Sequence, residues 1–204
     1  LLLLVLLPVS ALASSDVPEL VMNARDGVVR IIITRNDGVA YSLGTGFVVG
    51  QEDEYYVVTN HHVIEDTLDE DRLGIRVYDD TAEYVDAEIL LDAPERDLCI
   101  LKLSRTIPDA VVLPLQTETF DSGVAGYALG YPGAADTLSG DWENYEESDD
   151  IVATKSSMTI TDGIVSALRE SISVANYSRN GMVVQTNTAI KGGNRPGPHR
   201  HKAG

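Results

Sequence analysis

Short runs of apolar and β-branched residues, separated by turn residues, make up most of the chain from Asp26 onward. Such runs are typical of β-strands, and the 3.6-residue periodicity of amphipathic helices is almost absent. The pattern therefore predicts an all-β protein. Six strands are expected in the first part of the chain, at residues 28–34, 41–49, 55–59, 74–78, 84–91 and 98–103.

A proline-marked connector at residues 107–116 separates these strands from a second β-rich stretch. Two tandem six-stranded antiparallel units are predicted, the first at 22–106 and the second, which we expect to be incomplete, at 117–194. In the second unit, strands are expected at 124–129, 158–168 and 182–187.

An acidic insertion, residues 134–153, interrupts the second unit and contains no Lys or Arg. Clustered carboxylates suit calcium, and a long insertion can also gate a cleft. The insertion lacks the ligand spacing of a helix-loop-helix calcium site, so we favour a solvated surface loop and predict no metal or other cofactor.

The charge of the whole chain limits its partners. The sequence has 32 Asp and Glu against 15 Lys and Arg, a formal net charge of −17 at pH 7. A field of this sign repels polyanions, so nucleic acid and anionic membranes are not expected partners. Hydrophobic residues make up 44% of the chain, which is enough for a packed core.

The first residues predict export. Leu1 to Leu7 form an apolar run, and Ala11 and Ala13 follow with the small side chains of a signal-peptidase site. Residues 1–13 are thus expected to be a signal peptide, a partial one because it lacks Met and a basic segment, and too short to span a membrane.

Cys99 is the single cysteine, so no disulfide can form within the chain. An exported protein without disulfides fits the bacterial envelope, and we expect a secreted or periplasmic location. Cys99 lies in an apolar run and is expected to be a buried structural thiol rather than a nucleophile.

Two segments carry candidate acid-base chemistry. His62 follows the expected strand 55–59, although a histidine at a strand end is more often structural or merely exposed. His61 beside it suggests a metal, but neighbours in an extended segment point to opposite faces and cannot easily share one ion. Asp97 precedes the apolar run 98–103 and is either a turn residue or a buried carboxylate, for which the N–H of His62 would be a fitting donor.

A third segment, residues 185–194, runs from an expected strand into the pair Gly192 and Gly193. Glycine allows backbone angles that turn successive N–H groups toward one point, as an oxyanion hole requires. By itself this pair is a weak signal.

Six phrases in this order resemble the trypsin-like (chymotrypsin-fold) serine proteases, and most closely their HtrA-like bacterial branch. They occupy residues 44–49, 59–64, 97–103, 128–133, 161–168 and 185–194. The resemblance extends over roughly residues 22–194 and implies two β-barrels of the trypsin-like type. It also implies an exported serine endopeptidase that acts on polypeptides through a Ser/His/Asp triad, and an oligomer by analogy.

Matched residue by residue, the resemblance makes His62 the general base and Asp97 the acid that orients it. It makes Gly193 a backbone donor of the oxyanion hole, and it places Ala189 at the base of the specificity pocket, which would favour small or medium apolar side chains. The nucleophilic serine of the family would stand at position 195, where this chain has Arg195.

Arg195 removes the nucleophile, because a guanidinium stays protonated and cannot be acylated, and Pro196 stiffens a loop that should curve around the oxyanion. The tail, residues 195–204, is basic, whereas the sequence before it is acidic and has the pattern of β-strands. We favour a change of reading frame near the codon for Asn194. The alternative is a pseudoprotease that binds polypeptide or acts as a chaperone, against which the retained pair His62 and Asp97 argues.

Overall fold

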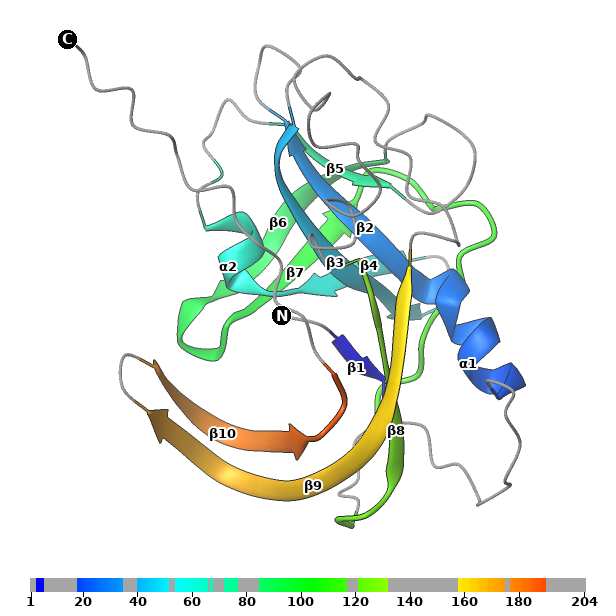
Figure 1. Ribbon diagram of the computed structural model, residues 1–204. Coiled ribbons are helices and arrows are strands. Elements are labelled where there is room, and N and C mark those ends of the chain that lie inside the picture. The colour runs from blue at the N-terminus through cyan, green and yellow to red at the C-terminus, as the bar shows by residue number, and fades with distance from the viewer. Residues whose placement is uncertain are drawn as a thin grey trace, which may run out of the picture.

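The computed structural model describes residues 3–5, 18–34, 40–51, 54–65, 67, 72–76, 85–116, 121–131, 158–174 and 177–189. Strands dominate this part of the chain, and they form a closed barrel and a separate four-stranded sheet (Figure 1). The acidic insertion 134–153 and the basic tail 195–204 lie outside the described residues.

The closed barrel contains six antiparallel strands in the order β2–β3–β4–β7–β6–β5. Its strands are β2 (Val28–Thr34), β3 (Ala40–Gln51), β4 (Glu54–Thr59), β5 (Arg72–Arg76), β6 (Val85–Ala93) and β7 (Leu98–Leu103). These are the six strands that the apolar pattern predicts, with the ends of β2 and β7 where the sequence places them.

The burial pattern explains why these segments form strands. In β7, Cys99, Leu101 and Leu103 are buried while Lys102 between them is exposed, the two-residue alternation of a strand with one face in the core. By contrast, β2 is buried from Val28 to Ile33 without alternation, because the barrel interior covers one face and the rest of the chain covers the other.

The second sheet has four described strands in the order β1–β8–β9–β10. They are β1 (Leu3–Val5), β8 (Ala125–Gly130), β9 (Thr159–Val174) and β10 (Tyr177–Thr186). The hairpin of β9 and β10 is longer than the apolar pattern predicts, since its far half pairs through polar positions such as Asn180 with Ser171. The six strands expected for this unit are therefore shown only in part.

β1 lies within residues 1–13, where the sequence predicts a signal peptide. It pairs antiparallel with β8, with Leu3 opposite Leu129 and Val5 opposite Tyr127. This pairing belongs to the uncleaved chain. Removal of the segment by a signal peptidase stays a prediction.

Among the residues that the structure describes, four short helical segments occur that strand-like patterning does not predict. They are α1 (Glu19–Ala24), η1 (Arg25–Gly27), α2 (His61–Ile64) and η2 (Pro94–Arg96). Each is too short for the 3.6-residue period to be read from the sequence. No helix among the described residues is long and apolar enough to cross a membrane.

The connector after β7 runs along the first barrel. The N–H of Val111 donates to the carbonyl of Asp26 at 3.1 Å, and the N–H of Leu113 donates to the carbonyl of Val48 at 2.9 Å. Ile107 and Leu113 are buried in the same core as the barrel strands. The expected linker 107–116 is thus packed against the barrel through backbone bonds and apolar side chains.

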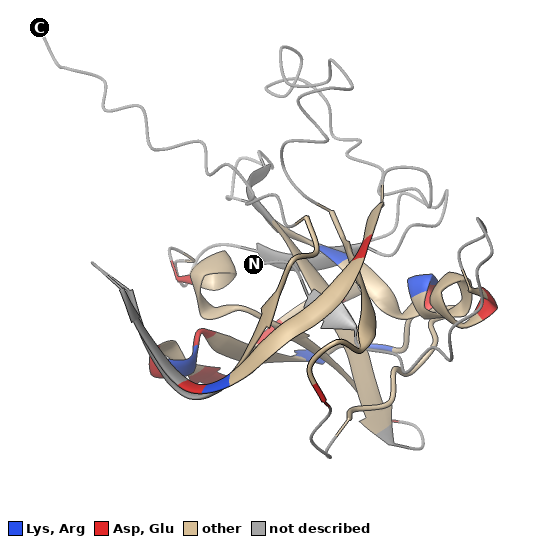
Figure 2. Cartoon of the chain, turned by 60° about the horizontal axis from the view of Figure 1, so that its bottom comes forward, with Lys and Arg blue, Asp and Glu red and all other residues tan. Residues whose placement is uncertain are grey.

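Charged residues of both signs occur together at a few places on the described elements (Figure 2). Acidic and basic positions lie side by side around α1 and along the far part of β9, and the strands between them are mostly uncharged. This arrangement is that of a solvated outer surface over an apolar interior.

The buried thiol of Cys99 is expected to lower the stability of the protein at alkaline pH. Burial raises the pKa of Cys99 from 9.0 to about 12, with a smaller contribution from Asp92. The unfolded chain loses this proton above pH 9 and the folded chain keeps it, so the free energy of unfolding falls as pH rises from 9 toward 12. We expect Cys99 to add about 1.4 kcal/mol per pH unit to this slope in urea unfolding.

The variant Cys99→Ala is the control for this prediction, because it removes the thiol and keeps a small apolar side chain. Its unfolding free energy should fall less steeply between pH 9 and 10.5 than that of the unmodified chain. Equal slopes in the two proteins would contradict the assignment.

Candidate active site

The site begins where β4 leaves the barrel at Thr59. Asn60 follows in an extended conformation, and α2 then forms a single turn that carries His61 and His62. The expectation that the two histidines lie in an extended segment is wrong. The helical turn directs Val63 and Ile64 into the core, and the burial of these two side chains stabilises it.

Gly44 on β3 allows α2 to sit this close to the barrel. A Cβ added at Gly44 would contact the Val63 side chain, with Cγ2 of Val63 only 2.8 Å away. Any larger residue at position 44 would therefore displace the turn that carries His62.

Asp97 lies on the facing connection between β6 and β7, directly after η2. It adopts the left-handed conformation, with φ 53° and ψ 45°, which is uncommon for a residue other than glycine. Only 7% of the residue is exposed. A strained, buried carboxylate is held in such a place by its hydrogen bonds.

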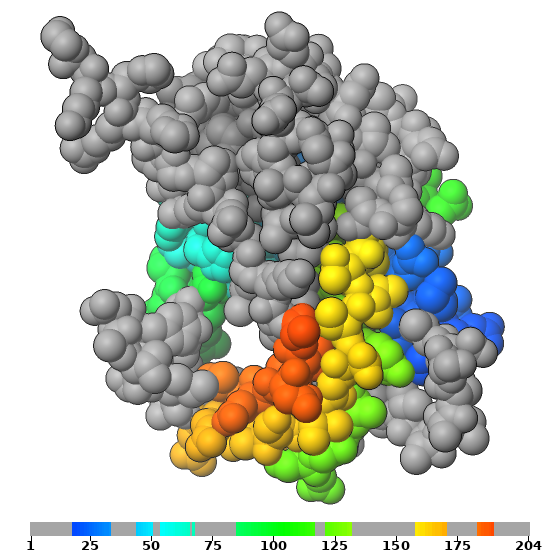
Figure 3. Space-filling model, in the orientation of Figure 1, coloured from blue at the N-terminus to red at the C-terminus, as the bar shows by residue number. Residues whose placement is uncertain are grey.

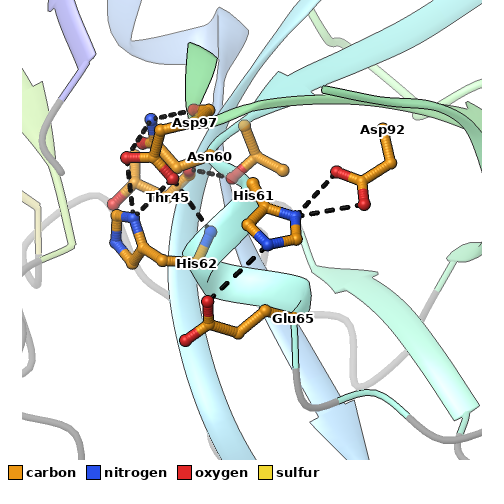
Figure 4. A network of polar contacts seen from close by, with 8 residues as sticks. Thr45, Asn60, His61, His62, Glu65, Asp92 and Asp97 are labelled. Carbon is orange, nitrogen blue, oxygen red and sulfur yellow. Dashed lines mark hydrogen bonds and ion pairs between the residues drawn. The ribbon is translucent and has the colours of Figure 1, made fainter. Parts of the chain in front are cut away.

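Those bonds come from Asn60 and His62 (Figure 4). Asn60 Nδ2 donates to the Asp97 carbonyl at 2.7 Å and lies 3.4 Å from Oδ2. The backbone N–H of His62 donates to Asp97 Oδ1 at 3.0 Å, and His62 Nδ1 lies 3.0 Å from both carboxylate oxygens. The structure therefore brings together the two side chains that the sequence singles out.

This arrangement fixes how the imidazole can react. When His62 Nδ1 carries the proton and donates it to the carboxylate, the lone pair is on Nε2, the nitrogen that acts as a base. The His62 side chain is 41% exposed and that of Asp97 is 8% exposed, so the base can reach a substrate while its partner is shielded. The pair is suited to general base catalysis.

A threonine pair connects this region with the second sheet. Thr59 Oγ1 donates to the carbonyl of Thr45 at 2.8 Å, and the N–H of Tyr131, just after β8, donates to Thr45 Oγ1 at 2.9 Å. Thr45 is buried, and it lies on β3 one residue from Gly44. The sequence alone does not reveal this link, because its partners are 86 residues apart.

The segment that leads toward position 195 is held by β9. Asn187 Oδ1 accepts from the N–H of Ile164 at 2.7 Å, and Thr161 Oγ1 donates to the carbonyl of Ala189 at 3.0 Å. Ala189 itself is exposed. Gly193 and Arg195 lie outside the described residues.

The two halves of the site face each other. β10 lies close to η2, the turn that precedes Asp97. In the space-filling view, the surface is open between the cyan and green atoms of the first barrel and the orange atoms of β10 (Figure 3). Within the described residues, no three His, Cys, Asp or Glu side chains come close enough to hold a metal ion.

A family model described as trypsin-like peptidase domain matches residues 44–202. This range contains β4 and β5, the barrel strands before and after α2, and the whole described second sheet apart from β1. The chain belongs to the trypsin-like peptidase family.

Solved structures agree with this assignment. The chain is similar to the crystal structure of Deg5, with 25% sequence identity and a TM-score of 0.57. The similarity covers 86% of this chain and 74% of the Deg5 chain. The chain shares the fold of AlgW, an HtrA-type protease solved with a tripeptide, over 86% of this chain and 47% of the other, with 22% identity and a TM-score of 0.56. No curated protein matches the sequence.

Proposed function

We propose that this chain of the trypsin-like peptidase family has the fold of an exported serine endopeptidase, in which His62 is the general base and Asp97 orients it. The observation that carries the proposal is the contact of His62 Nδ1 with both Asp97 oxygens at 3.0 Å, on a carboxylate that is almost fully buried. A surface ion pair would not need a strained, desolvated aspartate.

In the proposed reaction, a serine at position 195 attacks the peptide carbonyl and His62 Nε2 takes its proton. Asp97 stabilises the imidazolium that forms, and His62 then protonates the leaving amine. Backbone N–H groups at Gly193 and at position 195 hold the tetrahedral oxyanion. With Arg195 in place, attack and acylation cannot occur, so the chain with this sequence is expected to be inactive.

The nucleotide sequence past the codon for Asn194, translated in all three frames, tests the origin of Arg195. A neighbouring reading frame that encodes Ser-Gly-Gly-Pro, followed by further sequence with the alternating apolar pattern of β-strands, supports the endopeptidase. A stop codon in the present frame, together with a secreted product of the matching mass, supports a non-catalytic chain.

The second candidate is a pseudoprotease that holds polypeptide in the same cleft. Arg195 itself favours it, because its guanidinium can donate hydrogen bonds to the carboxylate of a peptide. The candidates differ in one measurement, since only the endopeptidase gains cleavage when serine is restored.

Specificity is proposed to depend on Ala189, which offers no charge to a basic side chain. A serine-restored protein should cleave after small or medium apolar residues in a peptide library. Ala189→Asp should shift cleavage toward Arg and Lys by about 10²-fold or more, because a carboxylate in the pocket pairs with a cation. Cleavage confined to Arg and Lys without the substitution would contradict the proposal.

We also propose export to the bacterial envelope, with polypeptides as substrates and with self-association by analogy with the family. The apolar leader and the lack of disulfides support the location. N-terminal sequencing of the product from the periplasm or medium tests it, with Ser14 as the expected first residue.

A further inference from the structure

A second histidine and aspartate lie beside the proposed catalytic pair (Figure 4). His61 Nδ1 lies 2.8 Å from Asp92 Oδ1 and 3.1 Å from Asp92 Oδ2. Its other ring nitrogen, Nε2, lies 3.6 Å from Glu65 Oε2 at the end of the same turn. The proposed reaction uses none of these three groups.

The two pairs connect the same two pieces of the chain. His61 and His62 are neighbours on α2. Asp92 is the next-to-last residue of β6 and Asp97 directly precedes β7, so the two aspartates lie on either side of η2. α2 is thereby attached to the β6–η2–β7 connection at two points.

A four-residue helix needs such attachment. A single helical turn is not stable alone, because its few hydrogen bonds do not offset the cost of ordering it. Asn60 offers no side-chain cap to the turn, since its amide is directed to Asp97. The bonds to Asp97 hold one side of α2, and the buried Val63 and Ile64 hold the side that faces the core.

We propose that His61 is a positioning residue that fixes the rotation of α2 and thereby keeps His62 Nδ1 on Asp97. Successive residues project about 100° apart around a helix, so contacts from His61 and His62 restrain the turn from two directions. The hydrogen bond from His61 Nδ1 to Asp92 provides this restraint, and the contact of Nε2 with Glu65 holds the ring from its other side. This inference rests on the proposed role of the His62 and Asp97 pair.

The partners are suited to orientation more than to stability. The side chains of His61, Asp92 and Glu65 are 21%, 32% and 34% exposed, so solvent screens their attraction. Their effect should therefore be seen at His62 and less in the unfolding free energy.

Proton NMR of the full chain tests the proposal without requiring activity. A proton on His62 Nδ1 that is bonded to Asp97 gives a downfield resonance, and its exchange with water reports how often the bond opens. His61→Ala is expected to raise this exchange rate about tenfold, the effect of losing one charge-assisted hydrogen bond that restrains the turn.

Two isosteric variants separate the nitrogens of His61. In His61→Asn, the amide nitrogen takes the place of Nδ1 and can donate to Asp92, so exchange at His62 should stay close to that of the unmodified chain. In His61→Gln, the amide reaches the place of Nε2 instead, and exchange should resemble that of His61→Ala. Equal exchange in the Asn and Gln variants would overturn the assignment to the Asp92 bond.

Substitution of the partner gives the reciprocal test. Asp92→Asn keeps an acceptor and should preserve slow exchange, whereas Asp92→Ala should not. Glu95→Gln, in a side chain that is 72% exposed in the same connection, is the control and should change nothing. The buried Cys99 thiol reports the fold, since slow reaction with a thiol reagent shows that the barrel is intact in each variant.

The outcomes distinguish this inference from the proposed function. A His62 resonance that is present and unchanged in both His61→Ala and Asp92→Ala overturns the positioning role and leaves the catalytic pair in place. If the unmodified chain shows no such resonance, the proposed pair itself fails, and the positioning role fails with it.

Discussion

Replacing Arg195 with serine and Pro196 with glycine is expected to give a chain that cleaves an unfolded protein substrate, and His62→Ala in that background should lower kcat/KM by about 10⁴-fold or more. Serine is a weak nucleophile without a base to take its proton. His62 is the exposed imidazole held on Asp97, so its loss removes proton transfer in both halves of the reaction.

The measurement is kcat/KM at neutral pH on an unfolded protein and on a short fluorogenic peptide. Glu95→Gln in the same background should keep the full activity, because the Glu95 side chain is exposed and its ion pair with Arg96, at 4.0 Å, is a weak surface contact. Equal activity with and without His62 would contradict the assignment of the base. A serine-restored chain that binds but never cleaves polypeptide would favour the pseudoprotease.

Gly163→Ala is expected to destabilise the protein and to impair the serine-restored enzyme. A Cβ at Gly163 would lie 2.5 Å from Thr188 Oγ1 and 2.7 Å from Thr188 Cα. The hydroxyl can rotate, but the Cα belongs to the backbone, so the segment that follows β10 must move away from β9. Overpacking of this kind costs about 1–3 kcal/mol in unfolding free energy.

The same displacement reaches the site, because the chain continues from Thr188 through Ala189 toward Gly193 and position 195. A shift of about 1 Å in a catalytic loop can lower kcat/KM by about 10²-fold. Ser166→Ala, at an exposed position of the same strand, is the matched control for both measurements. Unchanged stability and activity in Gly163→Ala would show that the two strands can separate without cost.

The first barrel could be read from the sequence because its strands follow local rules. β2 and β7 are continuous or alternating apolar runs bounded by turn residues, and burial in the structure follows the same positions. The far half of the hairpin of β9 and β10, where Asn180 lies opposite Ser171, was not predicted, because it extends beyond the apolar runs at 158–168 and 182–187.

The candidate site was predictable in its parts and not in its connections. His62 and Asp97 were identified by residue type, position beside strands and resemblance to a family. Their supporting residues were missed: Asn60 binds Asp97, and Thr45 links β3 to the end of β8. The adjacency of His61 to His62 was a visible signal, but the choice of Asp92 as its partner was not.

By itself, the sequence determined a mostly β protein with six apolar strands at its front, and it singled out an imidazole and a carboxylate suited to acid-base work. That Arg195 stands at the position of the nucleophile stays a prediction from the family resemblance. Only the tertiary structure decided that His61 and His62 lie on a helical turn and that each contacts a different aspartate of one connection. The reason is physical: the apolar pattern that marks a strand involves residues close together in the chain, whereas these contacts join residues 31 and 35 positions apart, which meet only after the barrel has closed.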